Sequence, residues 1–236
     1  MLIINLFKSI KEIVIVYILQ LILIILGYLL YINTQSSPNQ TYFITKICPW
    51  LLIFFYTAII SFFITKNKIP TSSLNYHQLY KLISLGISIS CIFNMLIFLK
   101  NSPLNTNYSI NFILMIISSG IIGPIAEEIL FRYILLNNLK KYYPSSYSVI
   151  ISTIVFSLIH LNILKIIYAM IIGFILNILY HKTNNLKVPI IVHITANITS
   201  LFLTSFNIYI LLLSITLLTI ILLTKKEYLC WFGILF

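Results

Sequence analysis

Residues 110–139 read INFILMIISSGIIGPIAEEILFRYILLNNL, an apolar stretch that contains two glutamates and an arginine. A helix needs about 20 apolar residues to cross the hydrocarbon core of a bilayer, and this stretch is long enough. A charged side chain at the centre of that core costs roughly 2.5–3.5 kcal/mol on insertion scales. Glu127, Glu128 and Arg132 therefore need a specific reason to lie inside a membrane helix.

The composition of the whole chain indicates that lipid is its solvent. Of its 236 residues, 60% are hydrophobic and only 8% are charged, and the mean hydropathy is +1.05. A soluble domain has about 25% charged residues, so this chain has too few charges to cover a surface that faces water. Its length allows about eight spans with short loops. We therefore predict an all-α, polytopic membrane helical bundle that forms a single domain over residues 1–236.

Polar breaks between the apolar runs divide the chain into eight predicted transmembrane helices. The first run is too long for the core of a signal peptide and has no small-residue cleavage site, so we expect it to remain as the first span. The expected limits are residues 10–32, 47–65, 79–99, 110–139, 147–162, 164–181, 187–205 and 207–224.

The positive charges predict the orientation of these helices. The net charge is +11, and the lysines lie singly or in pairs between apolar runs, which is typical of topology signals and not of a nucleic-acid-binding surface. With a cytoplasmic N-terminus, eleven lysines lie inside and three outside. The inside set is Lys8, Lys11, Lys66, Lys68, Lys81, Lys140, Lys141, Lys182, Lys187, Lys225 and Lys226, and the outside set is Lys46, Lys100 and Lys165. Both termini are therefore predicted to be cytoplasmic, with the lipid bilayer and no nucleic acid as partner.

Helical spacing separates the roles of the three charges in the fourth span. Glu128 and Arg132 are four residues apart, so they can pair on one helix face. Glu127 is rotated by about 100° from Glu128 and points to a different neighbour. A purely structural ion pair would explain Glu128 and Arg132 but not Glu127. Two glycines and a proline within residues 118–124 are expected to kink the helix and to allow close backbone approach.

Histidines and an asparagine lie in two further spans. His160 lies near the end of the fifth, while His193 and Asn197 lie one turn apart on one face of the seventh. A lone polar residue in a span usually serves helix packing. Measured from the cytoplasmic helix ends, Glu127, His160 and Asn197 lie about 18, 20 and 15 Å deep, and His193 about 9 Å deep. These similar depths, in the cytoplasmic half of the membrane, favour a shared site.

Three motifs in this order resemble the CPBP family, also called the Abi family. This family groups CAAX prenyl proteases with bacteriocin-processing and bacteriocin-immunity proteins. Residues 127–132 (EEILFR) match EExxxR, residues 156–160 (FSLIH) match FxxxH, and residues 193–197 (HITAN) match HxxxN. The resemblance covers about residues 110–205, which would be the catalytic core, and the other spans match only as membrane helices.

The resemblance implies a glutamate-driven peptidase site. Glu127 would be the general base that activates water, with His160 assisting it. His193 and Asn197 would stabilise the oxyanion of the tetrahedral intermediate, where donors are worth most if water is scarce. If a zinc ion is present, its ligands would be Glu127, His160 and His193. The chain lacks the compact HExxH spacing and Asn is a poor zinc ligand, so we expect a site that requires no cofactor.

The resemblance also gives supporting roles to three residues, because Glu128 and Arg132 would orient the site and Phe156 would pack beside it. Other types of intramembrane protease fit less well, since the chain has no Asp for an aspartyl protease and no HExxH for a site-two protease. The implied activity is that of an intramembrane endopeptidase that cuts a membrane-associated protein or peptide near the cytoplasmic face.

Two other classes of function stay open. One is a proton-coupled transporter that uses the buried Glu and His residues as a relay, although the sequence has neither a repeat nor paired half-helices. The other is a CPBP-like binding or immunity scaffold without catalysis. The Ile-, Asn- and Lys-rich composition suggests an AT-rich genome. We therefore expect a bacterial plasma-membrane protein that acts in bacteriocin or pheromone processing or in self-immunity. The sequence indicates neither the substrate nor an oligomeric state.

Overall fold

The structure is a computed structural model, and it describes residues 2–35, 38–66, 69–100, 112–160, 162–203 and 207–223. All regular elements in these ranges are helices, which confirms the predicted all-α class. The chain forms two compact units: the first joins Met1–Ile69 to Thr106–Pro144, and the second joins Pro70–Asn105 to Ser145–Phe236. The single domain over residues 1–236 and the core over residues 110–205 stay predictions.

Eight helical segments follow one another in the order that the sequence predicts. Five are long and apolar enough to cross a membrane, over Ile4–Thr34, Cys48–Thr65, Tyr76–Leu96, Phe112–Leu139 and Ile163–Thr183. Three shorter apolar helices cover Ser145–Leu158, Lys187–Phe202 and Ile208–Ile221. This pattern fits a polytopic helical bundle. Lys68, Lys225 and Lys226 lie outside the described residues, and the cytoplasmic placement of both termini stays a prediction.

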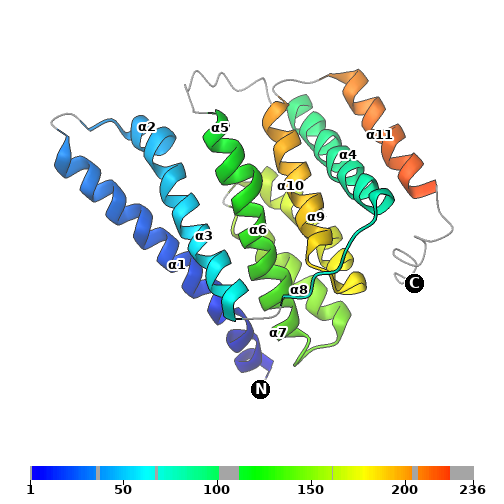
Figure 1. Ribbon diagram of the computed structural model, residues 1–236, viewed down its shortest axis with the longest axis horizontal. Coiled ribbons are helices and arrows are strands. Elements are labelled where there is room, and N and C mark those ends of the chain that lie inside the picture. Colours follow the sequence, from blue (N-terminus) through cyan, green and yellow to red (C-terminus); the bar gives the residue numbers. More distant parts are fainter. Residues whose placement is uncertain are drawn as a thin grey trace. The chain divides into compact units, whose positions relative to one another are not determined.

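Among the described residues, the first unit contains three long helical segments (Figure 1). The first is α1 (Leu2–Thr34), and the second runs through α2 (Gln40–Tyr42), η1 (Phe43–Ile47) and α3 (Cys48–Lys66). The third runs through α5 (Phe112–Met115), η2 (Ile116–Ile122), α6 (Gly123–Glu128), η3 (Ile129–Leu136) and α7 (Asn137–Leu139). Helix α1 packs against α3 and η3, and α3 packs against η2 and α6. Helices α1 and α3 thus both pack against the segment that carries the two glutamates.

Two π-helical stretches, η2 and η3, flank the short α6 helix. Gly123 donates its N–H to the Ser118 carbonyl, five residues earlier, and Pro124 has no N–H to offer. The sequence predicted a kink at this point, and the structure shows a local widening of the helix. Widened turns of this kind are frequent at functional sites, since they change the direction in which side chains point.

Among the described residues, the second unit contains five helices (Figure 1). These are α4 (Tyr76–Lys100), α8 (Ser145–Leu158), α9 (Ile163–Thr183), α10 (Lys187–Phe202) and α11 (Ile208–Leu223). Helix α4 packs against α10 and α11, while α9 packs against α8 and α10. Buried Asn177 of α9 reaches α8, where its side-chain nitrogen lies 2.9 Å from the Thr153 hydroxyl. Such a polar contact between apolar helices holds their register.

The fifth helix is shorter than predicted. We expected it to end at residue 162, but α8 ends at Leu158 and His160 lies just beyond it. The His160 N–H is bonded to the Ser157 carbonyl at 3.1 Å, three residues earlier, which closes the helix in a tight turn. Asn162 then caps α9, because its side-chain oxygen accepts the N–H groups of Leu164 and Lys165. His160 is thus carried by a turn and not by a helix.

Candidate active site

Glu128 and Arg132 form the predicted ion pair. The Arg132 Nη1 and Glu128 Oε1 atoms lie 2.9 Å apart, and both side chains are fully buried. Removing one partner of such a pair leaves a buried charge without compensation, whereas the pair as a whole is far less costly. The observed geometry suits the orienting role that the family resemblance implies for these two residues.

Glu127, in contrast to its neighbour, is only partly buried. Tyr17 on α1 and Tyr56 on α3 lie within electrostatic reach of its carboxylate. The two consecutive glutamates thus differ in burial, as their rotation about the helix leads us to expect. Glu127 belongs to a polar cluster of the first unit, which we call the glutamate cluster and which comprises Tyr17, Tyr56, Glu127, Glu128 and Arg132.

Phe156 holds both predicted catalytic histidines in the second unit. Its ring centroid lies 5.3 Å from that of His160, and the two rings are at 69°. The His193 ring lies 6.0 Å from the same phenyl ring, at 84°. Both are edge-to-face arrangements, which suit the quadrupole of an aromatic ring. Phe156 is itself 1% exposed, so a buried ring packs against both imidazoles.

The contacts of His160 define which of its nitrogens is available. Its Nδ1 lies 3.1 Å from the Phe156 carbonyl oxygen. Because a carbonyl can only accept, Nδ1 must carry the hydrogen, and in the neutral ring Nε2 is then the basic atom. A basic Nε2 suits the predicted role of assisting in water activation. It would equally suit a metal ligand whose other nitrogen is held by a carbonyl.

His193 and Asn197 lie one turn apart on α10, as predicted. His193 is buried, and Asn197 is partly exposed. Thr195, between them, packs against Gly86 of α4 so closely that a Cβ atom at position 86 would overlap the Thr195 hydroxyl. The same Cβ would lie 2.6 Å from the Val192 carbonyl oxygen. Because Gly86 has no side chain, α4 can approach closely the part of α10 that carries these residues.

The structure groups the seven predicted site residues into two clusters. The first unit holds Glu127, Glu128 and Arg132, and the second unit holds Phe156, His160, His193 and Asn197. Within either unit, the described residues contain no group of three His, Cys, Asp or Glu side chains placed to hold a metal ion. The three predicted zinc ligands, Glu127, His160 and His193, come from both units. Zinc binding thus stays a hypothesis.

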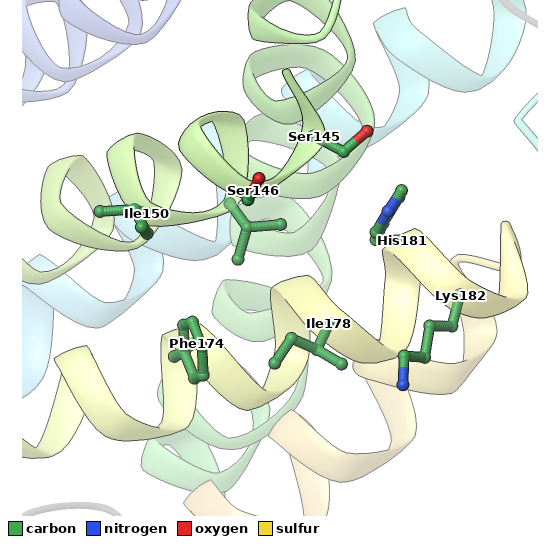
Figure 2. A pocket seen from close by; sticks show the side chains of 8 residues that line it. Ser145, Ser146, Ile150, Phe174, Ile178, His181 and Lys182 are labelled. Atoms are coloured by element: carbon green, nitrogen blue, oxygen red, sulfur yellow. The ribbon is translucent and has the colours of Figure 1, made fainter. Parts of the chain in front are cut away.

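A hollow of about 310 Å³ lies elsewhere in the second unit, between α8 and α9 (Figure 2). It is mostly apolar, and two potentially basic side chains at the end of α9 lie at one side. The residues that line it are Ser145, Ser146, Val149, Ile150, Phe174, Ile178, His181 and Lys182. None of the predicted catalytic residues is among them, so we assign the hollow no role in the chemistry.

A comparison with known families identifies the segment that carries these clusters. Residues 109–199 match the family model of the Rce1-like type II CAAX prenyl endopeptidases. The chain carries an Rce1-like domain. This match confirms the resemblance to CPBP proteases and supports an intramembrane endopeptidase of the CAAX type, and the apolar helices fit a multi-pass membrane protein. No curated protein and no solved structure matches the chain.

The sequence analysis missed the two tyrosines of the glutamate cluster. Tyr17 and Tyr56 lie in the first two helical segments, outside the Rce1-like domain. The chain has 16 tyrosines, and a tyrosine in an apolar span is ordinary by composition. Only the packing of α1 and α3 against η3 and α6 distinguishes these two from the others.

Proposed function

We propose that this protein hydrolyses a peptide bond of a membrane-associated substrate by using Glu127 to activate water. The observation that carries the proposal is the contrast between the two adjacent glutamates. Glu128 is fully buried and paired with Arg132 at 2.9 Å, whereas Glu127 is partly exposed. A general base has to reach the water whose proton it takes. Of the two carboxylates, Glu127 is the one placed to do so.

The second unit provides the complementary groups in this proposal. His160, with its hydrogen on Nδ1, presents a basic Nε2 that assists Glu127. His193 and Asn197 provide donors for the oxyanion that forms when water adds to the peptide carbonyl. Preorganised donors of this type typically contribute about 10²–10³-fold to the rate. The buried Phe156 ring packs edge-to-face against both imidazoles and supports their orientation.

We infer that the substrate is a peptide or a membrane protein, cut near the cytoplasmic face of a bacterial plasma membrane. The depth of the polar residues, counted along the predicted spans, supports the cytoplasmic side. The Ile-, Asn- and Lys-rich composition supports a bacterial origin, and the CPBP resemblance supports a role in bacteriocin or pheromone processing or in self-immunity. In a self-immunity role without catalysis, the same fold would act as a binding scaffold.

Cleavage by purified protein in detergent tests the catalytic role of Glu127. Candidate prenylated and unmodified peptides are incubated with wild type, Glu127→Gln and Glu12→Gln, and the products are measured by mass spectrometry. Glu127→Gln should lower kcat by about 10²–10⁴-fold, because the proton acceptor is lost while the shape is kept. Glu12 is exposed near the N-terminus, so Glu12→Gln should retain full activity and serves as the matched control.

The same assay separates the alternatives. If Glu127→Gln keeps full cleavage, the glutamate mechanism is wrong. If wild type cleaves none of the peptides and Glu127→Gln still protects cells in an immunity assay, the protein is a scaffold. A chelator that stops cleavage, with recovery on adding zinc, would support Glu127, His160 and His193 as metal ligands. Resistance to the chelator would support the mechanism without a metal.

A further inference from the structure

The first helical segments of this chain contribute hydroxyl groups beside Glu127. Helix α1 brings Tyr17, and α3 brings Tyr56, to the part of the third segment that carries the glutamates. Neither helix belongs to the region that matches the Rce1-like family. Their contribution to the site would therefore be a property of this chain in addition to the shared domain.

Packing of the rings fixes both tyrosines at this place. The Tyr17 ring lies 6.2 Å from the ring of Phe131, which is fully buried on η3. Tyr56 is 7% exposed, and its ring lies against Gly123, where an added Cβ would be 3.8 Å from the Tyr56 ring edge. Gly123 is four residues before Glu127, so it lies about one turn away along the helix. A methyl group at position 123 would be in ordinary van der Waals contact with the Tyr56 ring.

The two hydroxyl groups differ in their hydrogen bonds. The Tyr56 hydroxyl lies 3.3 Å from the side-chain oxygen of Gln20, one helical turn after Tyr17 on α1. The Tyr17 hydroxyl is buried and has no hydrogen-bond partner among the described residues. A buried hydroxyl without a partner is costly, and such groups usually bind a water or a polar ligand. Tyr17 contacts Phe131 and Tyr56 contacts Gly123, each about one helical turn from Glu127, so both hydroxyl groups lie within electrostatic reach of its carboxylate.

We propose that Tyr17 and Tyr56 are positioning residues that hold the Glu127 carboxylate in its working orientation. Tyr17 donates its hydroxyl hydrogen to a water that bridges it to the carboxylate. Tyr56, whose hydroxyl is held by Gln20, restricts the positions that the Glu127 carboxylate can take on the α3 side. This inference rests on the proposed function, because it gives Glu127 the role of general base. It adds that the N-terminal helices, and not only the Rce1-like domain, determine the rate of the chemical step.

Tyrosine-to-phenylalanine variants of the full-length protein test this proposal, because they remove one oxygen and keep the ring. In the cleavage assay, Tyr17→Phe should lower kcat by on the order of tenfold with an unchanged KM. Tyr56→Phe should lower kcat by a smaller factor. The matched control is Tyr28→Phe, on the same helix and about 16 Å further along it. Tyr28 packs against Phe43 at 5.0 Å, and its variant should keep both kcat and KM.

The outcomes distinguish this inference from the proposed function. If wild type is active, Glu127→Gln is inactive and Tyr17→Phe keeps its kcat, only the positioning role is wrong. If Tyr17→Phe lowers the unfolding temperature and the loss of folded protein accounts for its lower rate, the hydroxyl acts in folding. The inference is then likewise overturned. If wild type itself cleaves no peptide, the proposed function and the positioning role fail together.

Discussion

Glu127 and Glu128 have different environments in this protein, although they are consecutive in the chain. Glu128 is enclosed with Arg132, and Glu127 lies partly open beside two tyrosines. The difference follows from helical rotation, since neighbouring residues point about 100° apart. One carboxylate can therefore stabilise the site while the other takes part in the reaction.

The buried ion pair gives a prediction at the level of single residues. Arg132→Met leaves the Glu128 carboxylate buried without its partner and should destabilise the protein by about 3–5 kcal/mol. The double variant Glu128→Gln with Arg132→Met removes both charges and should recover most of that loss. Thermal unfolding in detergent, followed by circular dichroism, measures the difference. Equal unfolding temperatures for the single and double variants would show that the two side chains do not stabilise each other.

Helix contacts in the second unit depend on small residues. Gly86 allows α4 to approach α10 beside Thr195, and Ser84, Ser88 and Ser90 are also buried on α4. In lipid, no hydrophobic force drives helices together, and close packing between them takes its place. Small residues permit such packing. The position of His193 and Asn197 therefore depends on a helix without any predicted catalytic residue.

Gly86→Ala should disturb that contact. The new methyl group would overlap the Thr195 hydroxyl and lie 2.6 Å from the Val192 carbonyl oxygen, and backbone cannot move as readily as a side-chain end. We expect a loss of about 1–3 kcal/mol in unfolding free energy and reduced cleavage. The control is Gly27→Ala on α1, whose methyl group would meet only the flexible end of Leu51. A Gly86→Ala protein as stable and active as the control would rule out this packing role.

At the scale of the whole molecule, the lysine distribution predicts both termini in the cytoplasm. The test uses a protein in which Cys48, Cys91 and Cys230 are replaced by Ser and one new cysteine is introduced. A membrane-impermeant maleimide added to intact cells should label Lys165→Cys, which lies outside in the predicted topology. It should label His77→Cys only after permeabilisation. Both positions are exposed on the protein surface, so the reverse pattern would mean an inverted orientation.

The sequence by itself determined the class of the protein, the order of its helices and the Glu128–Arg132 pair. These features depend on local properties: apolar composition, the length of each run and a spacing of four residues on one helix. The three motifs also sufficed to indicate the family, because residue type and spacing carry that resemblance.

The tertiary structure decided which side chains surround these residues. The sequence prediction lacked the end of α8 before His160, the close approach at Gly86 and the two tyrosines near Glu127. Each depends on contacts between helices or on how a turn closes. Local periodicity does not show which face of a helix packs against another helix, or which helix that is. Apolar spans lack the polar face that would reveal their orientation in a soluble protein. Packing between distant segments alone therefore determines the surroundings of the site.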